Sequence, residues 1–358
     1  MNRNILLKIG GFLILALAML SCTNTNLSPV FYAIEHEKSL VDDRGFPDDA
    51  VVQRIIQNGA GNYFAAAGTL YTRAPGGGAW SPISAPVAGA LCTNVEIFGT
   101  NLVAAYLAPG NNGLYYRDVG LGDSWTLVTS LPANAQIGLI RNINSNLFVS
   151  TLSGDTYGLY YSNALTTAFT ATNVTASDSG GTGPISDIVW DNANTTYWVS
   201  VGSALKSGTV LPNGFASYAG ADNPTTGRAF GGLFISSSGT LYLGADGKFY
   251  TRPTAGPWAA HPVPAVGDNS VQFTTFVEIP APPLATADVY AGTGGYGYYV
   301  TSSLVRSPSY TISALFDGAI LSMLYDGSGA TPVLLLGTYN SGLWRGDWDG
   351  ANWQWKQE

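Results

Sequence analysis

The chain repeats one pattern of hydrophobic and polar positions seven times after about residue 60. Each copy has a short apolar run rich in small residues, a Gly-rich or polar break, and a pair of bulky residues. The pairs begin 44 to 49 residues apart. They are Leu70-Tyr71, Leu114-Tyr115, Leu159-Tyr160, Leu205-Lys206, Phe249-Tyr250, Tyr298-Tyr299 and Leu343-Trp344. A strand-rich repeat of this period is typical of β-propeller blades, so we predict an all-β, seven-bladed propeller of four-stranded antiparallel blades over residues 50–358.

The last repeat shows the expected order of strands within a blade. Residues 320–325 predict an inner strand, and the apolar run 333–337 predicts a second strand that is buried on both faces. Residues 343–345 then predict the third strand, and residues 353–355 the outer strand after a hairpin through 347–350. In the first repeat, the equivalent inner strand is expected at residues 51–56.

A large aromatic residue follows each pair, 9 to 12 positions after the pair's first member. These residues are Trp80, Trp125, Phe169, Phe215, Trp258, Tyr310 and Trp353. Because a large ring at one repeated site can bury 150–250 Å², we predict that they pack between neighbouring blades. Small residues in the second strands, such as Gly244, should let adjacent sheets approach closely near the axis.

Two alternatives concern the architecture. Residues 31–34 form a short apolar run before the first repeat, and the sequence leaves open whether they close the ring by adding to the last blade. A transmembrane barrel is the other all-β possibility. Its strands need about 9–11 residues, and the runs in this chain are shorter.

The amino terminus reads as a targeting segment. Arg3 and Lys8 precede an uncharged apolar run, and Ser21-Cys22 follows it. This arrangement resembles the signal peptide of bacterial lipoproteins, which implies removal of residues 1–21 and lipidation of Cys22. Residues 22–49 then form a tether, and Thr23 favours the outer membrane by the sorting rule of such proteins. An ordinary secretory signal or an uncleaved membrane anchor remains the alternative.

Composition narrows the classes of partner. Charged residues make up 11% of the chain, the net charge is -8, and there is no run of Lys or Arg, which argues against nucleic acid as a partner. Cys92 is the only cysteine besides Cys22, and we expect it in the core. His36 and His261 lack a partner at metal-ligand spacing, so we predict no metal and no cofactor. We expect a monomer.

The segments Gly113–Asp118 with Trp125, and Asp349-Gly350 with Trp353, resemble the Asp-box repeats of sialidase-like propellers. This resemblance implies a hairpin-stabilising motif and no activity. Arg73, Arg117 and Arg252 superficially suggest the arginine triad of a sialidase. They share one position of the repeat, however, so we expect them on separate blades with stems packed on aromatic rings and heads in solvent.

We therefore expect a non-catalytic, lipid-anchored envelope scaffold that binds a protein or glycan through a propeller face. The polar loops after the inner strands supply the candidate binding residues Asn142, Asp191, Asn194 and Asp326. We expect Asp191→Ala and Asp326→Ala to leave stability nearly unchanged. The alternative is an envelope glycosidase or lyase that uses acids at the mouth of the channel. Its candidates are Asp187, Asp191, Glu278 and Asp317. Two carboxylates about 5 or 6.5–9.5 Å apart in a cleft would favour the enzyme.

Overall fold

A computed structural model describes residues 44–358, except 121–123, 178–182, 210–213, 219–223, 225–229, 246, 255, 264–270, 308–314 and 316. Residues 1–21, Cys22, residues 31–34 and Tyr310 lie outside the described residues, so the predictions about them remain predictions. All elements of the described part are β-strands. No helix in that part has the length and hydropathy to cross a membrane.

The strands of the first four blades follow the chain in order. Blade 1 contains β1 (Arg54–Gln57), β2 (Tyr63–Ala67), β3 (Thr69–Arg73) and β4 (Ser81–Ile83); blade 2 contains β5 (Leu91–Phe98), β6 (Asn101–Leu107), β7 (Gly113–Asp118) and β8 (Thr126–Leu127); blade 3 contains β9 (Gln136–Ile143), β10 (Asn146–Ser153), β11 (Thr156–Ser162) and β12 (Thr170–Ser177); blade 4 contains β13 (Ile185–Asp191), β14 (Thr196–Val201), β15 (Ala204–Gly208) and β16 (Ala216–Ser217). In each sheet the strands pair antiparallel with their sequence neighbours.

The last three blades continue the same order. Blade 5 contains β17 (Leu233–Ile235), β18 (Leu241–Ala245), β19 (Lys248–Arg252) and β20 (Ala259–Pro262); blade 6 contains β21 (Phe273–Ile279), β22 (Asp288–Thr293), β23 (Tyr298–Val300) and β24 (Val305–Ser307); blade 7 contains β25 (Ile320–Asp326), β26 (Val333–Thr338), β27 (Leu343–Trp348) and β28 (Trp353–Gln357). The seven-bladed propeller predicted from the repeat is therefore confirmed, and every bulky pair lies in a third strand.

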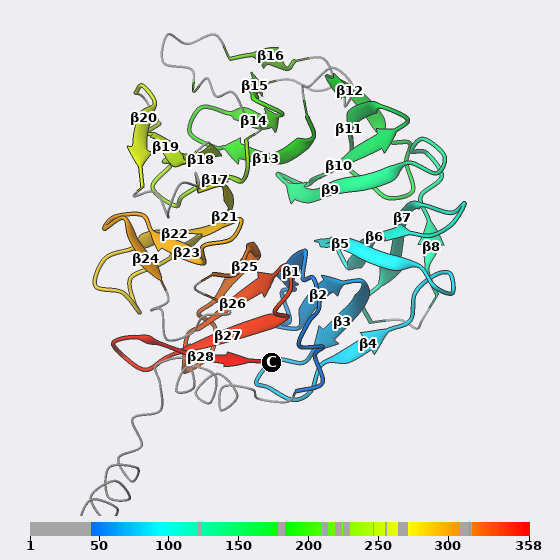
Figure 1. The fold of residues 1–358 in the computed structure, drawn as a ribbon. Helices are drawn as coiled ribbons and strands as arrows, with labels where there is room; N and C mark the ends of the chain where they lie inside the picture. The colour runs from blue at the N-terminus through cyan, green and yellow to red at the C-terminus, as the bar shows by residue number, and fades with distance from the viewer. Residues whose placement is uncertain are drawn as a thin grey trace, which may run out of the picture. The chain divides into compact units, whose positions relative to one another are not determined.

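The inner strands form the ring (Figure 1). β1, β5, β9, β13, β17, β21 and β25 contact one another in succession, and β25 contacts β1. The hydrophobic clusters lie between sheets: each draws buried side chains from two blades that are adjacent in the ring. The core is thus a series of interfaces between blades, as expected for a repeat fold.

The inner strands share an irregularity near their beginning. In blades 2, 4, 6 and 7 the register with the second strand skips one inner-strand residue: Thr93, Ser186, Thr274 and Leu321, respectively. Such bulges bend a strand and increase its twist. In blade 4 the buried Ser200 hydroxyl accepts the amide hydrogen of Asp187 at 3.0 Å, so the bulge leaves this amide satisfied.

Two sequence expectations need adjustment. The first inner strand begins at Arg54, later than expected, because the Val52 amide donates to Thr338 of blade 7 at 2.8 Å and so leaves the strand. In blade 7 the third strand extends to Trp348, so the hairpin turns at residues 349–352. The close approach expected at Gly244 is confirmed, since a Cβ there would lie 2.7 Å from Phe273 of blade 6.

The repeated aromatic residues pack against the preceding blade. Trp258 is buried and meets Trp198 of blade 4 edge to face, with ring centroids 6.3 Å apart. Trp125 is only half-buried, and its Nε1 donates to the Ser84 carbonyl of blade 1 at 2.7 Å. The same arrangement recurs for Trp80 on blade 7, Phe169 on blade 2, Phe215 on blade 3 and Trp353 on blade 6. The expected interface role is confirmed, although the rings differ in burial.

The seam between blades 1 and 7 contains a buried ion pair. The guanidinium of Arg73 pairs with the Glu358 carboxylate, and these side chains are 1% and 0% exposed. Trp80 donates its Nε1 hydrogen to the same carboxylate at 2.9 Å. The Arg73 guanidinium also lies over the rings of Tyr63 and Trp80, 5.8 Å from each centroid. The last residue of the sequence therefore joins blade 7 to blade 1.

A second group of bonds at the seam centres on Asp326. Its carboxylate accepts hydrogen bonds from the Tyr63 hydroxyl, from Gln57 at 2.9 Å and from the Ser328 amide at 2.8 Å. Burial alone would raise the pKa of Asp326, but these hydrogen bonds outweigh it and hold the pKa below the ordinary value. The ionised carboxylate therefore fastens blade 7 to blade 1.

We predict that Trp258→Ala lowers the free energy of unfolding by about 3–5 kcal/mol, as for other buried aromatic residues. Trp125→Ala should cost less, because Trp125 is only partly buried. Denaturant midpoints of the two variants and the wild type measure the difference. Equal midpoints for all three would contradict the packing role of this repeated site.

We also predict that Asp326→Asn lowers the free energy of unfolding at pH 7 by about 1–3 kcal/mol, since the amide has one acceptor oxygen where the carboxylate has two. Because the folded-state pKa of Asp326 is depressed, its contribution is present above the unfolded-state pKa near 3.9 and disappears as pH falls through the folded value. The gap between variant and wild type should thus close in acid. Asp155→Asn, in an exposed turn, is the control and should show no such gap.

Candidate functional site

The predicted loop residues lie on one face of the propeller. In an antiparallel four-stranded sheet, the turns between the first and second strands and between the third and fourth strands lie at the same edge. We call the side of the ring formed by these turns the AB–CD face; it includes residues 99–100, 144–145, 163–169, 192–195, 236–240 and 327–332. Asn142, Asp191, Asn194 and Asp326 all lie at its turns.

Asp191 and Asn194 form one turn in blade 4. The Asp191 carboxylate accepts from the Asn194 amide at 3.2 Å and from its Nδ2 at 2.7 Å. Asn194 also donates to the Thr254 carbonyl of blade 5 at 3.0 Å. Asp191 is 2% exposed, so little of its side chain reaches the surface. The pair holds the turn and links blades 4 and 5.

The structure therefore corrects one expectation about these loops. Plain surface turns would tolerate truncation without loss of stability, whereas Asp191 and Asp326 are buried. Asp326 bonds across to blade 1, and Asp191 holds Asn194, which bonds across to blade 5. Loss of the Asp326 carboxylate is expected to destabilise the ring, because the buried Tyr63 hydroxyl would be left unpaired. Loss of the Asp191 carboxylate would remove the acceptor that holds its turn. Their role in partner binding remains a prediction.

Asn142 lies at the end of β9 and bonds across to blade 2. Its Nδ2 donates to the Ile97 carbonyl at 2.9 Å, and its side chain lines a groove between blades 2 and 3. Of the four predicted residues, only Asn142 is among the described residues that line this groove. The structure thus gives Asn142 a place where it can meet a ligand.

The acids proposed for the enzyme alternative have separate partners. Asp187 of β13 pairs with Arg141 of β9 at 2.9 Å. A second ion pair lies nearby, between Glu96 of β5 and Arg54 of β1 at 3.1 Å. All four side chains belong to inner strands and are partly buried near the axis. Burial lowers the pKa of Arg54, and the nearby charge of Arg141 lowers it further, while Glu96 opposes both. The charges of this axial cluster balance.

The remaining acids lie elsewhere. Glu278 accepts from the Ser237 amide at 2.7 Å and from its hydroxyl at 2.8 Å, so it joins blade 6 to the turn of blade 5. Asp317 pairs with Arg306 at 2.7 Å and is largely exposed. Asp187 and Asp191 share β13 but are four residues apart, which corresponds to roughly 13 Å along a strand. No two of these acids share a hydrogen-bonding partner among the described residues.

The three repeated arginines are on separate blades, as predicted. Arg117 lies 5.7 Å from the ring centroid of Trp125, and Arg252 lies 5.1 Å from that of Trp198. Arg73 corrects the expectation of a solvated head, because its guanidinium is enclosed with Glu358. Cys92 is fully buried in the core as expected, and burial raises the pKa of its thiol to about 12.

The groove between blades 2 and 3 measures about 870 Å³. Its described lining consists of aromatic, amide, hydroxyl and small apolar side chains, with no Asp, Glu, Lys, Arg or His. These residues are Phe98, Gly99, Thr100, Asn101, Tyr116, Asn142, Asn144, Ser145, Asn163, Ala164, Leu165 and Thr166. We call it the blade 2–3 groove. Its described lining is an uncharged surface that combines aromatic faces with hydrogen-bonding groups.

The walls of the blade 2–3 groove are held by the protein itself. Asn144 and Ser145 adopt left-handed conformations with φ of 50° and 60°, which suit the two-residue turn between β9 and β10. On the other wall, the buried Ser162 hydroxyl bonds to the Ala164 carbonyl at 2.7 Å and to Thr167 at 2.8 Å. A ligand would therefore meet a groove that is already ordered, which reduces the entropic cost of binding.

Several groove residues were not predicted from the sequence. Phe98, Asn101, Tyr116 and Asn163 come from two blades and four different strands or turns, up to 65 residues apart. The only available signal was the repeat itself. Tyr116 directly follows the pair Leu114-Tyr115, so strand alternation places it on the face opposite Tyr115.

An equivalent groove between blades 5 and 6 has different chemistry. It measures about 410 Å³ and is lined by hydroxyl side chains together with His261, Glu278 and Asp288. His261 stacks on Phe249 at 4.9 Å, and burial lowers its pKa. Both carboxylates are already bonded to serine groups of the turns. Among the described residues there is no group of three or more His, Cys, Asp or Glu side chains placed to hold a metal ion.

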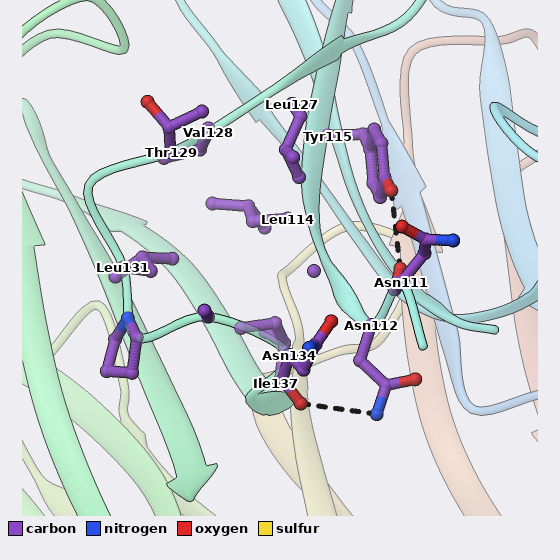
Figure 2. A pocket seen from close by; sticks show the side chains of 13 residues that line it. Asn111, Asn112, Leu114, Tyr115, Leu127, Val128, Thr129, Leu131, Asn134 and Ile137 are labelled. Atoms are coloured by element: carbon purple, nitrogen blue, oxygen red, sulfur yellow. Dashed lines mark hydrogen bonds between the residues drawn. The ribbon is translucent and has the colours of Figure 1, made fainter. Parts of the chain in front are cut away.

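Figure 2 shows a smaller pocket on the opposite face, between blades 2 and 3. It measures about 200 Å³ and has an apolar floor that includes Leu114 and Ile137. The amide of Asn112 at its rim is occupied, because it accepts from Ala108 at 2.9 Å and donates to the Asn134 carbonyl at 3.3 Å. The pocket is therefore mainly a packing defect between loops, and the blade 2–3 groove is the better candidate site.

Comparisons with known proteins support the fold. No family model and no curated protein matches the sequence. Many solved structures match, with identities that show the fold alone. An ancestral GH74 enzyme has a TM-score of 0.65 and 12% identity, covering 88% of this chain and 47% of that one. A chain of the mitotic checkpoint complex has a TM-score of 0.56 and 14% identity, covering 84% and 92%.

A bacterial extracellular domain is also similar. The extracellular domain of the hybrid two-component system BT4673 from B. thetaiotaomicron has a TM-score of 0.60 and 15% identity, and the match covers 83% of this chain. The chain spans 38% of the length of that structure. Together with the ring of blades, these likenesses show that the chain is a seven-bladed β-propeller.

Proposed function

We propose that the protein is a non-catalytic, lipid-anchored envelope scaffold that binds a protein or glycan partner through the blade 2–3 groove. The observation that carries this proposal is the groove itself. It is larger than the groove between blades 5 and 6, its described lining is uncharged, and its walls are ordered by bonds within the protein. A binding surface with few precisely placed polar groups needs no reacting side chain.

The arrangement of acids supports binding over hydrolysis. Glycoside hydrolysis needs two carboxylates on either side of one bond. Asp187 and Glu278 belong to different blades, and each carboxylate has its own partner in Arg141 or Ser237. These acids serve as links between blades in the described structure.

The envelope location rests on the amino-terminal pattern and agrees with one comparison. The apolar run that ends at Ser21-Cys22 resembles a lipoprotein signal, and one similar structure is a bacterial extracellular domain. A lipid on Cys22 would place the propeller at an envelope membrane, with residues 23–49 as the connection. Two or three acyl chains make such attachment nearly permanent.

We predict that a photo-crosslinking residue in the groove captures the partner in intact cells. Asn163→p-benzoylphenylalanine places the probe on the groove, whereas Asn192→p-benzoylphenylalanine places it on the same face at an exposed turn outside it. Illumination should give a discrete higher-mass adduct at position 163 and none at position 192. Absence of an adduct at 163, or equal adducts at both positions, would contradict the proposed function.

We also predict that Cys22→Ala moves the protein from the membrane to the soluble fraction and abolishes incorporation of labelled palmitate. Fractionation and labelling of whole cells measure both. Ser28→Ala, which leaves the cysteine in place, is the control and should behave as wild type. Membrane retention of Cys22→Ala without label would instead indicate an uncleaved anchor.

A further inference from the structure

We propose that the ligand of the blade 2–3 groove is an uncharged oligosaccharide, an inference that rests on the proposed function of that groove. Its lining combines two features that suit a sugar ring. Phe98 and Tyr116 provide aromatic surface, and side-chain amides lie beside them. A pyranose ring likewise has apolar C–H faces and a rim of hydroxyl groups.

The aromatic surface is available because both rings are only partly buried. Phe98 and Tyr116 pack one side against the hydrophobic cluster between blades 2 and 3, and the remainder lines the groove. The Tyr116 hydroxyl has no hydrogen-bond partner among the described residues. A rigid ring backed by a packed core provides contact area at little entropic cost.

The amides supply hydrogen bonds of both directions. A side-chain amide carries two N–H donors and a carbonyl acceptor, which matches a hydroxyl that donates and accepts. Asn101 and Asn163 make no side-chain hydrogen bonds to other described residues, so their amide groups remain available. Asn142 donates one side-chain N–H to the Ile97 carbonyl, and its side-chain carbonyl oxygen can still accept a hydrogen bond.

The absence of charge among the described lining residues argues for a neutral ligand. A carboxylate, phosphate or sulfate group would need a cation or several N–H donors to compensate its desolvation. A basic ligand would be better served by the groove between blades 5 and 6, where Glu278 and Asp288 are located. Both grooves lie between consecutive blades on the AB–CD face, and they differ in the charge of their described lining residues.

The mixture of aromatic and polar groups in the groove also favours a sugar over a protein partner. Protein interfaces concentrate their binding energy in a few buried apolar or arginine side chains, and the contacts around these side chains exclude water from them. The described lining has no Arg or Trp, and its amide and hydroxyl side chains outnumber its apolar ones. A chain of linked sugar rings offers both apolar C–H faces and hydroxyl groups to such a lining.

The test uses the full-length purified protein and an envelope preparation of the native host. The preparation is digested with proteinase K, and its polysaccharide is separated by anion exchange into an unretained neutral fraction and a retained charged fraction. Binding to the intact preparation and to each fraction is measured on immobilised material. We expect binding to the neutral fraction that changes less than about twofold between 0.05 and 0.5 M salt, because no ion pair is screened.

Groove variants then locate the site. Tyr116→Ala, and the double variant Asn101→Ala with Asn163→Ala, should each weaken binding to the neutral fraction at least about tenfold, as expected for loss of a stacking ring or of two hydrogen bonds. Asn192→Ala, on the same face outside the groove, should bind as wild type. Because Tyr116 packs partly against the core, Tyr116→Phe provides a folded comparison that keeps the ring.

The other outcomes overturn the inference in different ways. Binding to the intact preparation that proteinase K abolishes would identify a protein partner and leave the proposed function standing. Binding confined to the charged fraction would refute a neutral ligand, and neutral binding unaffected by the groove variants would refute the site. Absence of any binding to the intact preparation, together with no adduct at position 163, would overturn both the inference and the proposed function.

Discussion

The propeller depends on the noncovalent seam between its first and last blades. The chain supplies all four strands of blade 1 at one end and all four strands of blade 7 at the other, so no strand of the described residues crosses the seam. Noncovalent contacts hold it instead. They include the backbone bond from Val52 to Thr338, the buried pair of Arg73 with Glu358 and the bonds of Asp326 to Tyr63 and Gln57. A buried ion pair contributes little when complete, but loss of one partner is costly. The seam therefore tolerates few substitutions.

The other interfaces are variations on the same solution. In the six blades where the structure describes it, an aromatic residue just before or at the start of the outer strand lies against the preceding blade. In blades 3 and 4, polar residues near the turn after the inner strand bond to a neighbouring blade. These bonds explain why polar turn residues such as Asp191 are buried. The blades are therefore held together in two ways, by aromatic side chains near the outer strands and by hydrogen bonds of the turns on the AB–CD face.

Sequence reasoning predicted the fold because the repeat is local. Pairs such as Leu114-Tyr115 mark the third strand of each blade, and the later aromatic residue follows 9 to 12 positions after the pair's first member. The side-chain contacts between blades could not be predicted from the sequence, because partners such as Arg73 and Glu358 are 285 residues apart. The candidate site was found only in part for the same reason. Asn142 was identified, whereas Phe98 and Asn163 become neighbours only after the blades have packed.

The long separation across the seam also has a consequence for biosynthesis. A ribosome that adds about 5–20 residues per second needs roughly 15–60 s to make the stretch from Arg73 to Glu358. During that interval Trp80 and Tyr63 have no blade 7 to cover them, so the first blade presents an uncovered aromatic face while the rest of the chain emerges. The protein is most exposed to misassembly before its final blade is complete, and a chaperone that shields apolar surface would act on blade 1 first.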